Sequence, residues 1–207
     1  MKNIIFDFDG TLVNSLPVAI EIYYELVPKA PRVTEQDIKR LRKLPAREIM
    51  KELRIPLRKV PGLLVKGRTM LAERMDEIHL FDGIYDVVTI DNPNIQLFIM
   101  SSNSEHNVHR TLKANKIDTV FRSVNGGVGL FSKASALKKL VKAHHLDKAD
   151  TYYIGDEVRD IEAAKKVGLQ SIAVTWGYND SEILSTREPD FLLRNPKELK
   201  KILMELV

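Results

Sequence analysis

Two aspartates separated by a single residue follow an apolar segment near the N-terminus. Residues 3–8 have the composition of a strand, and Asp7, Asp9, Gly10 and Thr11 stand at its end. Side chains two positions apart in a strand project to the same side, so the carboxylates of Asp7 and Asp9 are predicted to lie close together. Like charges at that spacing require a divalent cation, a shared proton or a bend of the chain between them. Gly10 permits a tight turn whose N–H groups can face an anion, although the pattern also fits a solvated Asp-Gly turn.

Hydroxyl groups and a lysine form two further candidate anion sites. Ser101 and Ser102 follow the apolar segment 95–100 at the predicted start of a helix, where side-chain and backbone donors can bind an anion. The alternative is an ordinary helix cap. Lys133 stands at the opening of another predicted helix, which is an unfavourable place for a cation unless an anion lies nearby. The alternative for Lys133 is a solvated side chain.

A second pair of acids follows the apolar segment 151–154. Asp156 comes directly after Gly155, and Asp160 follows one helical turn later. Carboxylate oxygens that arrive from two strand ends suit Mg²⁺, which needs few protein ligands and completes its shell with water and phosphate. The alternative is that Asp156 caps the helix and that Asp160 interacts favourably with the helix dipole.

The elements that carry these residues alternate along the chain. Predicted strands at 3–8, 95–100, 151–154 and 170–174 are separated by helical patterns, which predicts an α/β fold with a mainly parallel sheet covered on both faces. In such sheets ligands bind outside the carboxyl ends of the strands.

One region breaks this alternation. Residues 16–80 contain helical patterns and several prolines but no good strand, so we predict an inserted helical cap that lies over the site like a lid. The predicted catalytic core is then formed by residues 1–15 and 81–207.

Composition limits the possible function classes. The chain has 207 residues, of which 44% are hydrophobic, and its net charge of +4 is spread along the sequence, so we expect no nucleic-acid partner. The absence of cysteine excludes disulfides, thiolate zinc sites and cysteine nucleophiles. Asp7 and Asp9 interrupt the N-terminal apolar segment, and no apolar run approaches the roughly 18 residues that span a bilayer. A cytoplasmic protein without a membrane partner is expected; the oligomeric state is not indicated.

Taken together, four motifs resemble those of the haloacid dehalogenase-like superfamily: D-F-D-G-T, a strand ending in S-S-N, an isolated lysine, and G-D-x-x-x-D. The helical insertion resembles the C1 cap of the phosphoglycolate-phosphatase-like and β-phosphoglucomutase-like branches. Residues 81–83 resemble the return from that cap to the core, and residues 174–178 also resemble the phosphoglycolate-phosphatase branch. Glu157 departs from the pattern, because many members have a small polar residue there. The resemblance implies a Rossmann-like three-layer core.

The resemblance also implies roles for individual residues. Asp7 would attack phosphorus to form an aspartyl-phosphate, and Asp9 would protonate the leaving alcohol and then activate water. Mg²⁺ would be held by Asp7, the backbone carbonyl of Asp9 and Asp156, while Asp160 would orient its waters. The phosphoryl oxygens would be bound by Ser101, Lys133 and N–H groups near Gly10 and Ser102.

The predicted function is a Mg²⁺-dependent phosphatase that acts on a small phosphorylated metabolite, with phosphoglycolate as one candidate. The alternatives are a phosphomutase of the β-phosphoglucomutase type and a non-catalytic, receiver-like or regulatory phosphate-binding module. Asp9 argues against dehalogenation, which needs no acid at that position. Arg47, in the predicted cap, either grips a second anionic group of the substrate or simply solvates a helix.

Overall fold

The centre of the molecule is a parallel sheet whose strands run in the order β3-β2-β1-β4-β5-β6. The computed structural model describes residues 1–129 and 132–206, apart from the side chains of residues 46 and 57. The strands are β1 (Lys2–Phe6), β2 (Ile95–Met100), β3 (Phe121–Asn125), β4 (Thr151–Gly155), β5 (Gln170–Val174) and β6 (Phe191–Leu193). Every pairing between these strands is parallel, which confirms the predicted α/β class. The two edge strands, β3 and β6, were not predicted.

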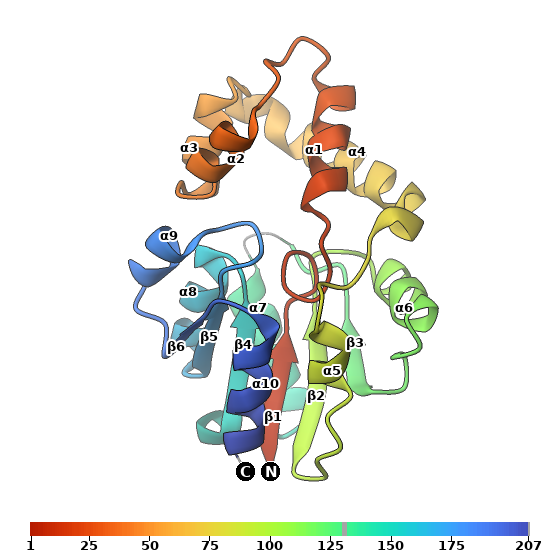
Figure 1. Cartoon of the computed structure of the whole chain (residues 1–207), viewed down its shortest axis with the longest axis vertical. Coiled ribbons are helices and arrows are strands. Elements are labelled where there is room, and N and C mark those ends of the chain that lie inside the picture. Colours follow the sequence, from red (N-terminus) through yellow and green to blue (C-terminus); the bar gives the residue numbers. More distant parts are fainter. Residues whose placement is uncertain (130–131, 207) are drawn as a thin grey trace.

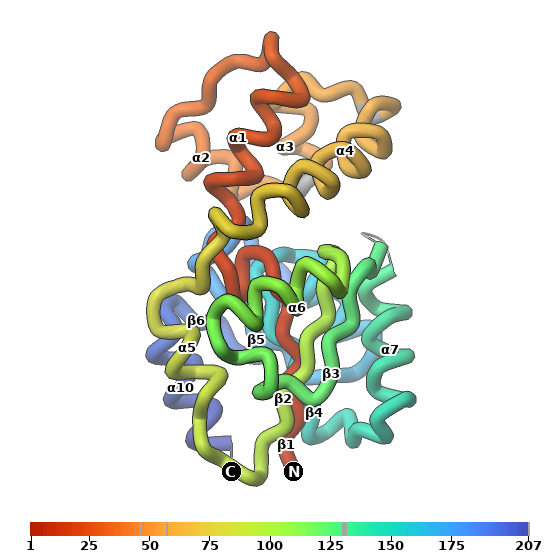
Figure 2. The backbone as a smooth tube through the Cα atoms, turned by 90° about the vertical axis from the view of Figure 1, so that its right-hand side faces the viewer, coloured from red at the N-terminus to blue at the C-terminus, as the bar shows by residue number. Residues whose placement is uncertain are grey.

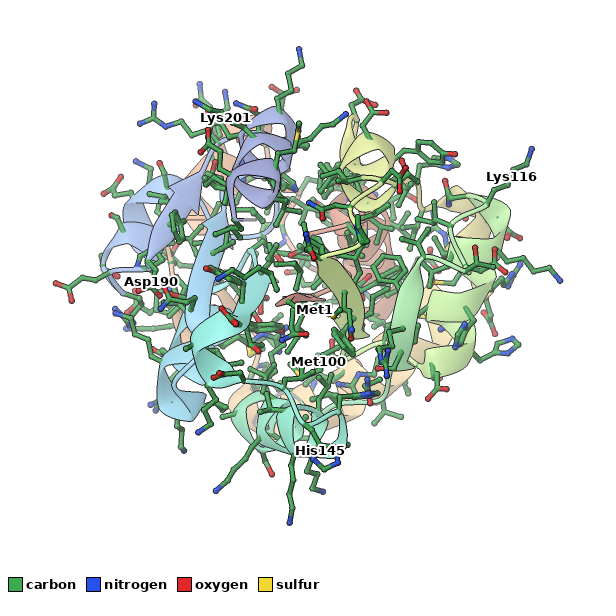
Figure 3. The ribbon with its side chains drawn as sticks, turned by 90° about the horizontal axis from the view of Figure 1, so that it is seen from below. Met1, Met100, Lys116, His145, Asp190 and Lys201 are labelled. Carbon is green, nitrogen blue, oxygen red and sulfur yellow. The ribbon has the colours of Figure 1, made fainter. Side chains whose placement is uncertain are left out.

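Helices cover both faces of the sheet (Figure 1). They are α5 (Ile84–Val88), α6 (Glu105–Ala114), α7 (Lys133–Ala143), α8 (Val158–Val167), α9 (Ser181–Ser185) and α10 (Pro196–Glu205). The alternation of side chains along β1 decides which helices each face meets. Ile4 and Phe6 pack with residues of α5, α6 and α10, whereas Ile5 packs with residues of α7 and α8. Figure 3, seen from the end opposite the cap helices, shows the three resulting layers, with Lys116, His145 and Lys201 at the periphery.

The remaining helices lie together beyond one end of the sheet. They are α1 (Leu16–Leu26), α2 (Glu35–Leu41), α3 (Ala46–Glu52) and α4 (Val60–Glu73). Figures 1 and 2 show them over the end opposite the two termini, which is where the carboxyl ends of the strands lie. The described residues from 16 to 79 form helices and turns without a strand. We keep the division into a core of residues 1–15 and 81–207 and a cap of residues 16–80 as a proposal that this arrangement supports.

Two neighbouring segments connect the cap helices to the sheet. The N–H of Asn14 donates to the carbonyl of His79 at 2.9 Å, and the N–H of Phe81 donates to the carbonyl of Leu12 at 3.0 Å. The outgoing and returning chains therefore support each other, as expected for a hinge between two parts.

Strand β1 ends two residues earlier than predicted. Asp7 still donates its N–H to the carbonyl of Ile154 at 2.8 Å, but the chain then turns, and the N–H of Gly10 donates to the carbonyl of Val13 at 2.9 Å. Asp9 therefore leaves the sheet, and the strand-alternation argument for Asp7 and Asp9 does not hold. The sequence left three ways to accommodate two neighbouring carboxylates, which are a divalent cation, a shared proton and a bend of the chain. The structure shows the bend.

Candidate active site

The acids and the lysine gather at the carboxyl end of the central strands. Asp7 follows β1, Ser101 follows β2 and Asp156 follows β4, and these three strands are neighbours in the sheet. Lys133 begins α7 and Asp160 lies in the first turn of α8. The chain leaves β1 for β2 on one side, and β4 lies on the other, so the site occupies the switch point where open α/β sheets bind ligands.

Lys133 bridges two aspartates in the interior. Its Nζ lies 2.6 Å from Asp7 Oδ2 and also donates to Asp160 Oδ1. The hydroxyl of Tyr153 donates to the same Asp160 oxygen at 3.1 Å. Burial alone would lower the pKa of Lys133, but the charges of Asp160 and Asp7 outweigh it and raise that pKa above its ordinary value. Lys133 is therefore a fixed cation, although only 3% of its side chain is exposed.

Three buried carboxylates crowd around this lysine. Asp7, Asp156 and Asp160 can each place an oxygen within 4.8 Å of the others. Burial, reinforced by the charge of Asp160, raises the pKa of Asp7 to about 7 despite the opposing charge of Lys133. Burial and neighbouring acids also raise the pKa of Asp156 well above its ordinary value. One lysine does not neutralise three acids, so the cluster favours binding of another cation.

The donor set fits Mg²⁺. The cluster contains carboxylate oxygens and no histidine or cysteine, and hard oxygen ligands suit Mg²⁺ better than zinc. Asp160 already accepts bonds from Lys133 and Tyr153 on one oxygen and from the Glu157 N–H on the other, at 3.0 Å. With three such bonds, against two on Asp156, Asp160 is better placed to support the site than to bind a metal directly.

Asp156 is held in place by groups from two loops. Its Oδ1 accepts from the Thr11 hydroxyl at 2.9 Å, and its Oδ2 accepts from the Tyr178 N–H at 2.6 Å. Gly10, with φ +81°, lies so near that a Cβ on it would stand 2.2 Å from Asp156 Oδ2. Because the Gly10 N–H is bonded within its own turn, the visible contribution of Gly10 is close approach rather than a donor for an anion.

Asp9 has a different environment from Asp7. Its Oδ2 accepts from Asn103 Nδ2 at 3.3 Å, while its Oδ1 is buried and has no hydrogen-bond partner among the described residues. Asn103 is itself oriented, because its Oδ1 accepts from the Ser104 N–H and from Asn107 Nδ2, each at 2.9 Å. Burial raises the pKa of Asp9, which favours the protonated form that a general acid needs.

A cavity of about 310 Å³ opens above Asp7 and Asp9. Ser102, Glu157, Arg159 and Tyr178 also line it from the sheet side, and mostly apolar residues of the cap line the rest. The cavity therefore leads from the carboxylates into the helices above them, so a molecule bound there would contact both parts of the chain.

Of the predicted residues, Asp7, Asp9 and Ser102 line this cavity, and the others do not: Gly10, Arg47, Ser101, Lys133, Asp156 and Asp160. Ser101 is buried, and its hydroxyl accepts from the Asn103 N–H at 2.9 Å. Arg47 is exposed on α3 and is not among the residues that line the cavity. The solvated alternative for Arg47 fits this placement better than a contact with substrate.

Several residues of the site were not singled out from the sequence. Arg159 pairs with Glu157 through its Nε, and its Nη1 is buried without a partner among the described residues. Glu157 occupies the N-cap position of α8, a structural role that the sequence left open. Asn103 ends the S-S-N motif and Tyr178 ends the segment 174–178, but their contacts with Asp9 and Asp156 join segments far apart in the chain, so no local pattern could reveal these contacts.

One described feature bears on the membrane expectation. Among residues 1–129 and 132–206, no helix is both long enough and apolar enough to span a bilayer.

Comparison with known proteins agrees with the motifs. The family model of the haloacid dehalogenase-like hydrolases matches residues 4–174. A phosphoglycolate phosphatase from Synechococcus elongatus is 35% identical over 100% of this chain and 99% of its own length. Pyrophosphatase PpaX from Anoxybacillus flavithermus is 26% identical over 98% of this chain and 97% of its own.

The fold is also similar to that of solved structures. A haloacid dehalogenase-like family hydrolase from Streptococcus pneumoniae superposes with a TM-score of 0.79 at 22% identity, covering 98% of each chain. The chain therefore belongs to the haloacid dehalogenase-like hydrolases, as its four motifs predicted.

Proposed function

We propose that this hydrolase is a Mg²⁺-dependent phosphatase that cleaves a small phosphate monoester through an aspartyl-phosphate on Asp7. The observation that carries the proposal is the placement of Asp7, which faces the cavity and is bonded to Lys133 on one carboxylate oxygen. No described residue hydrogen-bonds the other oxygen, Asp7 Oδ1. That oxygen is the nucleophile in the proposal.

Asp7, Asp156 and the backbone carbonyl of Asp9 would hold Mg²⁺, with Asp160 supporting its waters. When bound, the ion neutralises charge on Asp7 and on the phosphoryl group, so that a carboxylate can approach a phosphate anion. Lys133 adds a fixed positive charge next to the attacking carboxylate.

The first step transfers the phosphoryl group to the protein. An oxygen of Asp7 forms a bond to phosphorus while the bond from phosphorus to the alcohol oxygen breaks. The leaving oxygen takes a proton from Asp9, whose burial favours the protonated form. Asn103 holds Asp9 in orientation through Nδ2.

The second step restores the enzyme. Asp9, now a carboxylate, takes a proton from water, and the resulting hydroxyl oxygen bonds to phosphorus as the acyl-phosphate bond breaks. Asp7 is returned as a carboxylate and inorganic phosphate leaves. A phosphomutase would have to keep water out at this stage.

The test is hydrolysis of a panel of phosphate monoesters by the purified chain with Mg²⁺ and with EDTA. Phosphoglycolate belongs in the panel, and pyrophosphate, which is a phosphoanhydride, is assayed beside it, because the two relatives are named for these compounds. Phosphate release that requires Mg²⁺ supports the proposal. Release that survives exhaustive chelation contradicts the metal site, and no release from any ester contradicts the phosphatase.

A further inference from the structure

The cavity above Asp7 changes character with distance from the sheet. Charged and hydroxyl-bearing groups lie at its floor, where the reacting phosphate would bind. Its walls come from α1, α3, α4 and the segment between α3 and α4, and they are apolar apart from Arg68, which is exposed, and Tyr23. An anionic group far from the reacting phosphate would be desolvated there with little to hydrogen-bond it.

The apolar walls are incompletely covered by the protein itself. None of the residues of α4 is buried, and Leu63, Leu64 and Leu71 of that helix are half-buried around the opening. Apolar side chains that remain partly wet gain stability from an apolar ligand that removes them from water.

A glycine keeps the cavity open. Gly67 lies in the middle of α4, lines the cavity and faces Ile22 and Leu26 of α1. A Cβ on Gly67 would lie 3.6 Å from Leu26 Cδ1, which is an ordinary contact, so close packing does not require glycine there. Glycine is the least favourable residue after proline inside a helix, so its presence here leaves volume rather than stabilising α4.

We propose that this volume receives the leaving group, and that the preferred substrates are phosphate monoesters of alcohols with an extended apolar body. The proposal rests on the proposed phosphatase function and deepens it by assigning the chemical class of the alcohol. The names of the relatives point to two unlike substrates, phosphoglycolate and pyrophosphate. Both are small anions that could contact Arg159 at the floor of the cavity, but neither would fill the space between the apolar walls.

The first experiment is a series of n-alkyl phosphates from ethyl to octyl with the Mg²⁺-loaded enzyme. Each methylene that enters the cavity should raise kcat/KM, by at most about fourfold. The increase should stop when the cavity is full. A flat series, or a higher kcat/KM for phosphoglycolate than for hexyl phosphate, would overturn the proposal.

The second experiment narrows the cavity. Gly67→Leu should lower kcat/KM for octyl phosphate at least tenfold more than for ethyl phosphate. The matched control is Gly62→Leu on the same helix, where a Cβ meets no atom within 4 Å and which does not line the cavity. Gly62→Leu should show the same change in kcat/KM along the alkyl phosphate series as the wild type. Equal losses for both esters in Gly67→Leu would contradict a role in accommodating the chain.

Binding measurements test the cavity proposal independently of the proposed phosphatase function. Octylphosphonate and methylphosphonate cannot be hydrolysed as esters, so calorimetry with the Mg²⁺-loaded protein tests the cavity without turnover. Tighter binding of octylphosphonate, lost in Gly67→Leu, supports the cavity even if no ester is cleaved. Equal binding of the two phosphonates overturns the cavity proposal even if the chain proves to be a phosphatase.

Discussion

The sheet core and the cap helices differ in how completely they are packed. In the core, the central strands are almost entirely buried, and the buried polar groups Asp156, Asp160 and Lys133 are all hydrogen-bonded. In the cap helices, α4 has no buried residue and borders a cavity of about 310 Å³. The proposed reacting groups therefore lie in a rigid, closely packed frame, whereas the surface proposed to contact the rest of the substrate is loosely packed.

The two parts also touch away from their covalent connections. Arg42 Nη2 donates to the carbonyl of Thr175 at 2.8 Å, and the Asp180 N–H donates to the carbonyl of Arg42 at 3.0 Å. Asn179 is shared between the parts, because its Nδ2 donates to the Arg42 carbonyl at 3.3 Å while its Oδ1 accepts from the Val158 N–H at 3.1 Å. Its own N–H donates to the Asp156 carbonyl at 3.2 Å. Asn179 therefore links the cap helices to Asp156, the proposed metal ligand.

The largest effect should come from the rigid part. Asp7→Asn replaces the nucleophilic carboxylate by an amide, so turnover should fall by more than the roughly 10²–10³-fold that follows deletion of one stabilising donor. Steady-state assays with Mg²⁺ and circular dichroism measure activity and folding together. The exposed Asp118→Asn serves as the matched control and should behave as wild type. A folded Asp7→Asn enzyme with a near-normal turnover rate would contradict the mechanism.

Asp9→Asn should have a smaller effect that depends on the leaving group. An amide cannot protonate an alkoxide, but p-nitrophenolate leaves without a proton, so the loss in the first step should be greater for an alkyl phosphate. Rapid-mixing measurements of alcohol release compare the two esters directly. Equal losses for both would show that Asp9 serves structure rather than proton transfer.

Metal binding should stabilise the protein more at neutral than at acid pH. The pKa of Asp7 is about 7 in the folded chain against an ordinary value of 3.8, so between these values the folded state holds more protons than the unfolded state. The free energy of unfolding of the metal-free protein should therefore decrease as the pH rises through this range. Because Mg²⁺ binds the deprotonated carboxylate, the increase in Tm on adding it should be larger at about pH 7.5 than at about pH 5. Asp156→Asn should reduce that increase, and an increase independent of pH would contradict the reasoning.

The contact between cap and core predicts a more modest effect. Asn179→Ala removes donors to the cap carbonyl and an acceptor for the Val158 N–H, which should cost about 1–3 kcal/mol in kcat/KM. Lys43→Ala is the comparison, because Lys43 pairs with Glu182 on the exposed surface of the same contact, and such pairs contribute little. If both variants lose activity equally, the contribution of Asn179 is no greater than that of a surface ion pair.

Local patterns in the sequence predicted the central fold for a physical reason. The four strands that were predicted are apolar and mostly buried, so their composition reflects their position. β6 has only three residues, and β3 reads FRSVN with an exposed arginine at its second position, so neither carried a comparable signal. Both are edge strands, which need fewer apolar residues.

The sequence indicated candidate site residues that stand directly after the ends of predicted elements. It did not indicate residues whose contribution depends on contacts with distant segments. Asp7, Asp9, Asp156 and Asp160 stand at element ends that the sequence marks with glycine and apolar runs. Asn179 contacts distant segments of the chain, and Arg159 lines the cavity. The spacing of residues in the sequence reveals neither placement. For Arg47 the sequence left an anion contact and a solvated helix as alternatives, and its exposed position on α3 favours the solvated one.

The most direct test of the central claim is to trap the covalent intermediate. The Asp9→Asn enzyme, loaded with Mg²⁺ and p-nitrophenyl phosphate, is quenched with borohydride, which reduces an acyl phosphate to an alcohol, and its peptides are mapped by mass spectrometry. We expect that Asp7 alone is converted to homoserine, and that the conversion requires both substrate and Mg²⁺. Conversion at another carboxylate, or continued turnover with no trapped residue, would contradict this expectation.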